Sequence, residues 1–166
     1  MLEPLARAHA AELLVPLQSP SLYAWFEDDV FSTAEALADA WEALARMLRE
    51  RHGIARVSWV VRERASARAL GKLDVQLRER VATNVGWVFF PGGRGRGLAS
   101  ECVRALCEHL TAAGVLEQHA YVTAGNVDSV RVAEQVGFVA TQVFPGREQI
   151  RGLAYDEIAF VRKPAP

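Results

Sequence analysis

A loop rich in glycine and arginine carries the strongest chemical signal in this chain. Residues Trp87 to Glu101 read WVFFPGGRGRGLASE, in which an apolar strand leads into the loop and the loop leads into an amphipathic helix. Glycines allow a backbone to approach a ligand closely, and the first amides of a helix are unpaired donors beside a partial positive charge. Arg94 and Arg96 add guanidinium groups to these donors. The loop is therefore predicted to bind an anion such as a pyrophosphate.

Three other interpretations of this loop fit less well. A Walker P-loop needs a Lys-Ser/Thr pair after its last glycine, and Leu98 and Ala99 stand there instead. A dinucleotide-binding fingerprint needs a third glycine where Ser100 stands, and it belongs near the start of a βαβ unit rather than past mid-chain. An arginine-glycine segment that binds RNA usually belongs to a long disordered tract. This loop is short and lies between two predicted elements.

Arg94, Gly97 and Ala99 fit the pattern R-x-x-G-x-A, and a second motif follows the loop. The second motif runs from Asn126 to Phe138 and reads NVDSVRVAEQVGF. In these two motifs, which together cover about residues 84 to 138, the sequence resembles the GNAT acetyltransferase superfamily. The second motif is similar to that of the ribosomal-protein (alanine) N-acetyltransferase branch. The first half of the chain matches the family in pattern only.

The resemblance implies that acetyl-CoA is a co-substrate and that no metal is needed. The loop would hold the pyrophosphate, and the strand over 86–90 would offer backbone amides to the carbonyl and pantetheine. Asn126 would orient the cofactor, and Ser129 would donate a hydrogen bond to the sulfur, which makes Ser129 the leading catalytic candidate. The residues that the resemblance places at the cofactor are Val88, Phe89, Phe90, Arg94, Gly95, Arg96, Gly97, Leu98, Ala99, Asn126, Ser129 and Arg131.

Structural roles are the alternative for the polar residues of the second motif. Ser, Asn and Asp are common at helix starts because they cap free amides, so Asn126 or Asp128 could act only as a cap. Arg131 could equally be a solvated or salt-bridged helix residue. The sequence alone leaves both interpretations open.

The proton acceptor is the weakest part of the resemblance. Many relatives carry a glutamate on the strand before a Gly-Trp or Gly-Tyr pair, and this chain has Asn84 there. Asp74 is the expected substitute, acting through water, with Glu79, His119 and Tyr121 as alternatives. At pH 7 an α-amine with a pKa near 8 is about one tenth neutral, whereas a lysine side chain is neutral only about once in 2,500. A weak base therefore suits an α-amine acceptor.

These residues require a framework of strands and helices, which the hydrophobic pattern supplies. Helices are predicted over 6–17, 33–51, 97–113 and 127–136, and strands over 54–62, 69–78, 81–90, 118–123, 138–144 and 155–162. The predicted fold class is α+β (mixed α/β), in the order (β)ααβββαβαββ. By resemblance to the GNAT fold, a central, mostly antiparallel, twisted sheet of six to seven strands has helices on both faces. The opening strand of the family has little room before residue 6 and is expected to be short or frayed.

Length and composition indicate a single acetyltransferase domain over 1–166. The chain has 166 residues, of which 51% are hydrophobic, and this is enough for one substantial core. Residues 1–53 are expected to form a helical acceptor-side region, and 54–138 the sheet and acetyl-CoA-binding core. Residues 139–163 are expected to form a C-terminal hairpin, followed by a free tail.

Charge and hydropathy argue against several other classes of protein. The formal net charge of −1 gives no general attraction to nucleic acid or to an anionic membrane. No apolar run approaches the roughly 20 residues of a membrane span, and no signal peptide is evident, so a cytoplasmic location is expected. Cys102 and Cys107 have no Cys or His at metal-ligand spacing and are expected to be buried, reduced thiols.

The expected function is acetyl-CoA-dependent N-acetyl transfer to a primary amine, either a protein N-terminus or a small amine, by direct attack in a ternary complex. A non-catalytic acyl-CoA sensor is an alternative because the family glutamate is missing, and an RNA-binding protein is a weaker one. Acceptor identity, acyl-chain preference and a homodimeric state stay open. The aromatic residues near the first two helices fit either core packing or an acceptor site. They are Tyr23, Trp25, Phe26, Phe31 and Trp41.

Overall fold

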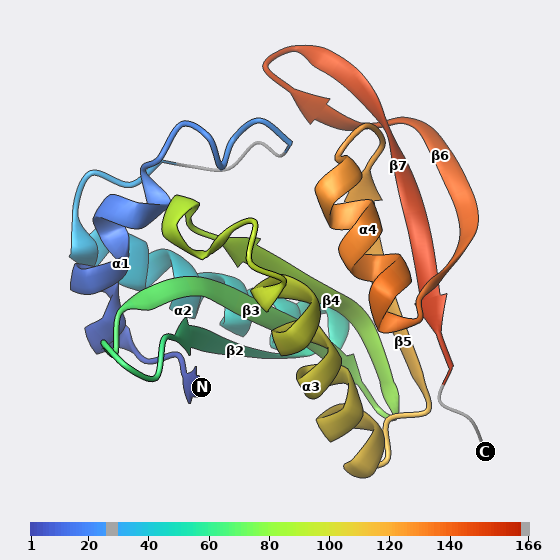
Figure 1. The fold of residues 1–166 in the computed structure, drawn as a ribbon, viewed down its shortest axis with the longest axis horizontal. Helices are drawn as coiled ribbons and strands as arrows, with labels where there is room; N and C mark the ends of the chain where they lie inside the picture. The colour runs from blue at the N-terminus through green and yellow to red at the C-terminus, as the bar shows by residue number, and fades with distance from the viewer. Residues whose placement is uncertain (26–29, 164–166) are drawn as a thin grey trace.

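One twisted sheet organises the protein in the computed structural model, which describes residues 1–25 and 30–163 (Figure 1). Phe26 and the predicted tail at 164–166 lie outside the described residues. Seven strands form the sheet in the order β1-β2-β3-β4-β5-β7-β6. The strands are β1 (Leu2–Pro4), β2 (Ala55–Arg62), β3 (Ala69–Arg78), β4 (Val81–Phe89), β5 (Glu117–Thr123), β6 (Val139–Ile150) and β7 (Leu153–Arg162).

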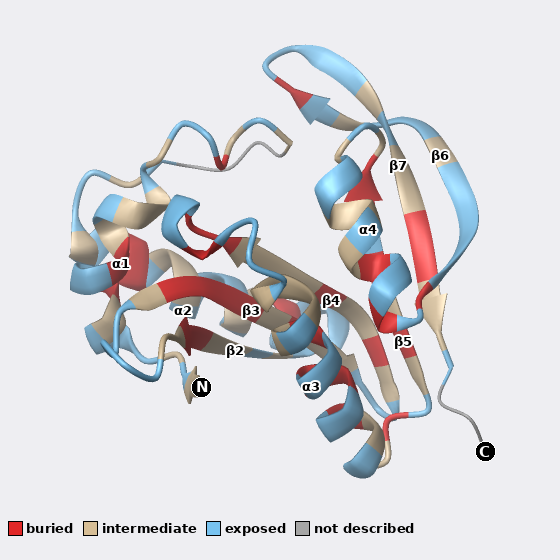
Figure 2. Cartoon of the chain, in the orientation of Figure 1, coloured by how far each residue is buried: buried red, intermediate tan, exposed pale blue. Residues whose placement is uncertain are grey.

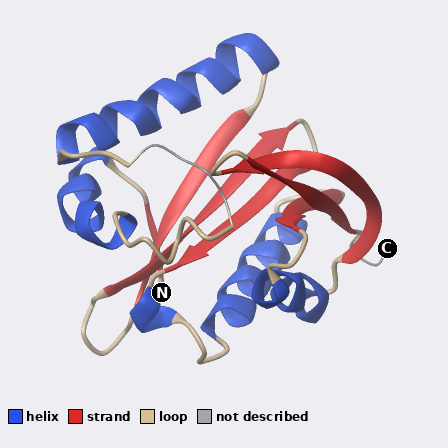
Figure 3. Cartoon of the chain, turned by 90° about the horizontal axis from the view of Figure 1, so that it is seen from above, coloured by secondary structure: helices blue, strands red, loops and turns tan. Residues whose placement is uncertain are grey.

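Helices cover both faces of this sheet, as predicted (Figure 3). The helices are α1 (Ala10–Leu17), α2 (Ala34–His52), α3 (Leu98–Ala112) and α4 (Val127–Val136), with single 3-10 turns η1 (Arg7–His9) and η2 (Pro91–Gly93). Thr33 caps the start of helix α2, where its Oγ1 accepts a hydrogen bond from the amide of Ala36 at 3.2 Å. It ends at Gly53, which has a left-handed φ of 63°. Within the described residues, no helix is long and apolar enough to cross a membrane.

The main core lies between the sheet and the pair α3 and α4 (Figure 2). Leu73 and Val75 of β3 are fully buried there against residues such as Leu106 of α3. Because side chains alternate across a strand, the neighbouring positions 72, 74 and 76 face the α1 and α2 side. A smaller cluster on that side contains Leu13 and Phe90. The polar residues of β3 therefore belong to the face that α1 and α2 only partly cover.

The centre of the sheet opens because β4 and β5 pair over a very short length. They are the only parallel neighbours among the described strands, and their paired residues are Val81 with Glu117 and Ala82 with Gln118. Beyond Ala82 each strand stays paired on its other side, β4 with β3 and β5 with β7. The two strands consequently diverge (Figure 1). Their backbone amides and nearby side chains frame the space described below.

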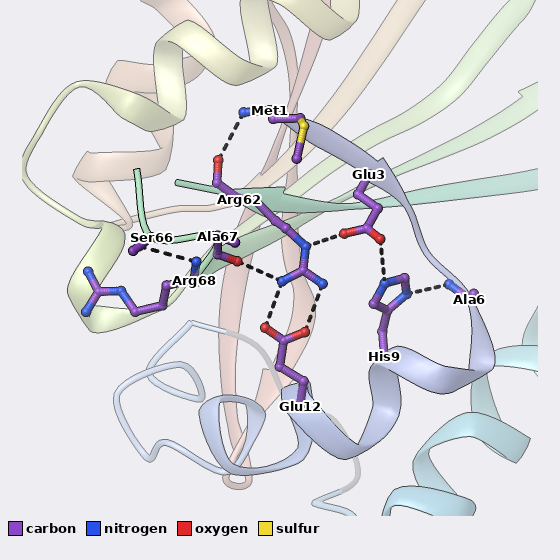
Figure 4. Close-up of polar contacts among 9 residues, drawn as sticks. All are labelled: Met1, Glu3, Ala6, His9, Glu12, Arg62, Ser66, Ala67 and Arg68. Carbon is purple, nitrogen blue, oxygen red and sulfur yellow. Dashed lines mark hydrogen bonds and ion pairs between the residues drawn. The ribbon is translucent and has the colours of Figure 1, made fainter. Parts of the chain in front are cut away.

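The first strand is short, as expected, and is held by an ionic network (Figure 4). Its three residues pair with β2, and the ammonium group of Met1 donates to the carbonyl of Arg62 at 3.0 Å. The Arg62 guanidinium donates to both carboxylate oxygens of Glu12, at 2.8 and 2.9 Å, and also contacts Glu3. These two carboxylates raise the pKa of Arg62. The network attaches α1 to the edge of the sheet.

The predicted order of elements and the fold class are confirmed, but the predicted bounds of the last two strands are wrong. Strands β6 and β7 extend beyond 138–144 and 155–162 and meet at a turn formed by Arg151 and Gly152, whose φ values are 52° and 74°. The Pro145-Gly146 pair is typical of a strand end. Here a register shift between Phe144 and Glu148 absorbs it as a bulge, and pairing resumes at Glu148. The longer hairpin reaches the opening between β4 and β5.

Candidate active site

The glycine-arginine loop has the backbone shape that its sequence predicts. Gly95 and Gly97 have φ values of 71° and 72°, and Gly97 is the N-cap of α3. At Gly93, a Cβ atom would lie only 2.6 Å from the carbonyl oxygen of Leu70, so only glycine fits this close approach. The first amides of α3 follow directly. Close backbone packing and a helix N-terminus therefore meet in one loop.

The two arginines of the loop have different environments. Arg94 Nε donates to the carbonyl oxygen of Phe89 at 2.8 Å, which holds the side chain along the loop. Arg94 also lines a cavity of about 460 Å³ between the loop and the start of α4, which we call the loop cavity. Arg96 instead forms an ion pair with Glu63 at 3.1 Å and does not line the loop cavity. The structure thus separates two residues that the sequence treats alike.

Most of the residues predicted to bind the cofactor line the loop cavity. They are Val88, Phe89, Arg94, Gly95, Gly97, Leu98, Ala99, Asn126, Ser129 and Arg131. Besides Arg96, the exception is Phe90, which packs in the smaller core with 4% of its surface exposed. Its amide already donates to the carbonyl of Leu70 at 2.9 Å. The structure therefore does not bring the Phe90 backbone to the cavity.

A second cavity, of about 330 Å³, lies between the diverging strands and the β6–β7 hairpin, and we call it the hairpin cavity. Its lining is rich in polar side chains from six strands. These are Arg56, Asp74, Gln76, Asn84, Tyr121, Thr123, Glu148 and Glu157. Asn84, at the position of the missing family glutamate, thus faces the hairpin cavity. The polar face of β3 and the extended hairpin meet around this one space.

The loop cavity and the hairpin cavity adjoin at a small set of shared residues. Trp25, Trp87, Val88, Asn126 and Ser129 line both. Trp25 is held at this junction because its carbonyl accepts a hydrogen bond from Thr123 Oγ1 at 2.7 Å. The other described aromatic residues near the first helices are Tyr23, Phe31 and Trp41. They pack in the smaller cluster around Leu13 and Phe90 or in a further cluster formed by Ala10, Leu37 and Ala38. Only Trp25 among them lines either cavity.

Ser129 lies in the first turn of α4, where Asn126 caps the helix. Asn126 Oδ1 accepts a hydrogen bond from the amide of Ser129 at 3.2 Å, so the capping alternative for Asn126 is realised. Asn126 nevertheless lines both cavities. Among the described residues, none forms a hydrogen bond with Ser129 Oγ. The hydroxyl is therefore available to a ligand at the junction of the cavities.

Asp74 lines the hairpin cavity, but its carboxylate is already engaged. It accepts a hydrogen bond from Arg56 at 2.8 Å and further hydrogen bonds from Ser58 and Lys72. Burial acts to raise the pKa of Asp74, but the charges of Lys72 and Arg56 outweigh it and hold the pKa below its ordinary value. These contacts favour the ionised form of the Asp74 carboxyl group. Its predicted role as a proton acceptor stays a prediction, which the contacts do not favour.

Glu157 was not among the residues predicted from the sequence, but it lines the hairpin cavity from β7. Its side chain is 15% exposed, and burial raises its pKa against the opposing charge of Arg147. Of the other proton acceptors considered, Tyr121 lines the same cavity. His119 contacts Glu117 at 2.7 Å and lines neither cavity. The available signal was a pair of acidic residues, Asp156 and Glu157, in the strand YDEIAFV, but which of them faces the cavity depends on the register of the hairpin.

No group of His, Cys, Asp and Glu in the described part of the chain could hold a metal ion. The two cysteines are free thiols, as expected. Cys107 is buried, and burial raises its pKa to about 12. Cys102 is only partly buried, which corrects the expectation that both are buried.

The comparison with known protein families agrees with this geometry. The sequence model of the acetyltransferase (GNAT) domain family matches residues 1–139. The chain belongs to the GNAT acetyltransferase family. It is therefore an N-acetyltransferase, with acetyl-CoA as its acetyl donor, and the resemblance noted in its two motifs is confirmed. The match ends at the start of the β6–β7 hairpin.

Solved structures share the fold of this acetyltransferase at low sequence identity. The ribosomal L7/L12 alpha-N-protein acetyltransferase RimL, in complex with coenzyme A, is 18% identical with a TM-score of 0.82, over 98% of this chain and 92% of RimL. Spermidine N-acetyltransferase from Vibrio cholerae, with CoA and spermine, is 17% identical with a TM-score of 0.79, over 98% and 94%. Ribosomal-protein-S5-alanine acetyltransferase from Vibrio fischeri is 17% identical with a TM-score of 0.82, over 98% and 91%. A search of curated protein sequences found no significant match.

Proposed function

We propose that this acetyltransferase moves the acetyl group of acetyl-CoA to a primary amine by direct attack in a ternary complex. The observation that carries the proposal is the junction of the two cavities in the opening between β4 and β5. A donor bound in the loop cavity and an amine bound in the hairpin cavity would meet beside Ser129. Such an arrangement holds two reactants together without a covalent enzyme intermediate.

The residues of the loop cavity fit acetyl-CoA. Gly95 and Gly97 have positive φ values that a side chain would strain, and Gly93 packs too closely on Leu70 for a Cβ atom. The first amides of α3 can donate to a pyrophosphate. Arg94 supplies a positive charge at the same place. The backbone of Val88 and Phe89 extends along the cavity, and Ser129 Oγ would donate a hydrogen bond to the thioester sulfur. Acetyl-CoA supplies an activated acyl group, and these residues bind and orient it.

The hairpin cavity fits an amine acceptor. Carboxylates from β6 and β7 and the rings of Trp25 and Tyr121 line it, and both kinds of group favour a cationic ammonium before it loses its proton. The structural neighbours named above act on protein N-termini and on a polyamine. We propose that the acceptor class of this enzyme is a primary amine of one of these two kinds.

Three stretches of the chain contribute to the proposed site, in keeping with one catalytic domain over 1–166. Residues 1–53 supply Trp25 on the acceptor side, and 54–138 supply the sheet and the acetyl-CoA-binding core. The hairpin over 139–163 supplies Glu148 and Glu157.

An acetyl-transfer assay tests the function with an alanine-terminated peptide and spermidine as acceptors. Free CoA thiol and an acceptor heavier by one acetyl group are expected, whereas acetyl-CoA binding without turnover would support the sensor alternative.

Replacing Arg94 by alanine is expected to weaken acetyl-CoA binding by about 1.5–3 kcal/mol, the contribution of a charged hydrogen bond. Arg96→Ala is the matched control in the same loop. It should weaken binding less, because Arg96 is paired with Glu63 and lies outside the loop cavity. Calorimetric titration with acetyl-CoA measures both dissociation constants. Equal losses in the two variants, or no loss in either, would contradict the placement of the pyrophosphate.

A further inference from the structure

A partly buried carboxylate on the hairpin faces the acceptor side of the proposed site. Glu157 of β7 pairs with Thr123 at the end of β5, directly before the turn into α4 (Figure 1). It lines the hairpin cavity together with Ser129. Its Oε2 atom is buried and forms no hydrogen bond among the described residues, although it forms an ion pair with Arg147 at 3.3 Å. A buried acceptor atom that receives no hydrogen bond is costly, and a ligand in the cavity that donates one would complete its contacts.

Arg147 forms an ion pair with this carboxylate. Its guanidinium lies 4.5 Å from the ring centroid of Phe144 and 5.5 Å from that of Tyr121. Its Nε atom lies 3.3 Å from Glu157 Oε2, and the residue does not line the hairpin cavity. The bulge between Phe144 and Glu148 places Arg147 in this position. Two rings thus fix one cation beside the carboxylate.

We propose that Glu157 accepts the proton of the acceptor ammonium and that Arg147 is the positioning residue that holds the Glu157 carboxylate. The inference rests on the proposed function and assigns its missing proton acceptor. It replaces both the family glutamate, whose position is occupied by Asn84, and the expected Asp74. The contacts of Asp74 do not favour it in this role, because its oxygens already accept hydrogen bonds from Arg56, Ser58 and Lys72.

The proton balance of the reaction is complete with these groups. The ammonium gives one proton to the Glu157 carboxylate, and the nitrogen lone pair forms the bond to the thioester carbonyl carbon. The carbon–sulfur bond breaks, and the sulfur leaves with the bonding electron pair. The second nitrogen proton goes to that sulfur, for which Ser129 Oγ is the adjacent hydrogen-bond donor. Glu157 then releases its proton to solvent, and the products are an N-acetyl amine and CoA.

The charged groups around Glu157 favour this role. Burial raises its pKa, Arg147 lowers it and Glu148 raises it, and the net direction is upward. A carboxyl group with a raised pKa is a better proton acceptor near neutral pH than an ordinary one. The same cavity is also lined by Tyr121 of β5, Arg56 of β2 and Asp74 of β3. Glu148 lines the cavity as well and, like Glu157, is partly exposed.

The test is the pH dependence of kcat/KM for acetyl transfer, measured for the wild type and for Glu157→Gln with the same acceptor. In the wild type, kcat/KM should fall as the pH drops through the Glu157 pKa, because the carboxyl becomes protonated. Glu157→Gln should lose this acid limb of the pH profile. Its kcat/KM near neutral pH should be about 100-fold lower than that of the wild type. The deficit should shrink at high pH, where the amine is already neutral. Acetyl-CoA affinity should be unchanged, which shows that the isosteric variant is folded.

Two further variants make the assignment specific. Glu148→Gln is the matched control, with the same loss of charge in the same cavity, and should keep the acid limb. Arg147→Met should move that limb upward by about one pH unit, because the carboxylate loses its neighbouring cation. Arg147→Lys should largely restore the acid limb to its wild-type pH. If Arg147 had a purely structural role, Arg147→Met would change the size of kcat/KM without moving the acid limb.

The outcomes separate this inference from the proposed function. A wild-type enzyme that turns over no amine, although it binds acetyl-CoA, would overturn the proposed function. An active enzyme whose acid limb persists in Glu157→Gln would overturn only the assignment of the proton acceptor. Loss of the limb in Glu148→Gln instead would move that role to Glu148 and contradict the proposal.

Discussion

Asp74→Ala is expected to lower the free energy of unfolding by about 3–5 kcal/mol, the cost of removing one member of a buried ionic cluster. The Asp74 carboxylate is bound by Arg56, Lys72 and Ser58, and its side chain is 19% exposed. Its removal takes a carboxylate away from the largely buried Lys72 and Arg56 charges. Urea unfolding measures the loss. Ser58→Ala, which removes only the neutral donor to the same carboxylate, should cost about 1 kcal/mol.

The contribution of Asp74 to stability has a defined pH dependence. The folded-state pKa of Asp74 lies below its ordinary value, so its contribution to stability is present above the unfolded pKa of about 3.9. It is lost as the pH falls through the lowered folded pKa. The stability gap between the wild type and Asp74→Asn should therefore narrow in acid. Equal stability of the two proteins at neutral pH, or loss of the acid limb of kcat/KM in Asp74→Asn, would contradict a structural role for Asp74.

Ser129→Ala is expected to lower kcat by about 100-fold, as for loss of a positioned proton donor, with little change in acetyl-CoA affinity. Ser129 lies at the junction of the two cavities, and its Oγ accepts or donates no hydrogen bond within the described structure. The amide of Ser129, not its hydroxyl, makes the capping contact with Asn126, so α4 should be retained. Steady-state kinetics at saturating acetyl-CoA provides kcat, and titration provides the affinity. Unchanged kcat would leave Ser129 without a catalytic role.

The cofactor side of the site was predictable because its signals are local in sequence. Positive φ at Gly95 and Gly97, the close approach at Gly93 and the helix that follows are encoded within one short segment. Local sequence also offered the cap at Asn126 as one of two interpretations, and α4 ends at Gly137, which has a left-handed φ of 94°. Short-range rules suffice where one loop and one helix start form a binding surface. What they could not show is that Arg94 enters the cavity while Arg96 pairs with Glu63.

The acceptor side was not predictable because it depends on registers between distant strands. Asp74 was expected to be available to a substrate, but its partners come from β2 and β3, and pairing decides which of them share its face. Glu157 faces the hairpin cavity only because β7 pairs with β5 in one register. A shift of one residue would turn its side chain to the opposite face. The bulge that places Arg147 beside it follows from the same long hairpin, which was predicted too short.

Thermal unfolding with and without excess acetyl-CoA tests the central claim most directly, since it asks whether the opening between β4 and β5 holds the acetyl donor. At about 100 times the dissociation constant, the ligand should add roughly 2.7 kcal/mol of stability, or on the order of 5 to 10 °C in Tm for a chain of this size. Arg94→Ala should show a smaller shift at the same concentration. A Tm that does not change with acetyl-CoA, free CoA or longer acyl-CoAs would contradict the account of this site.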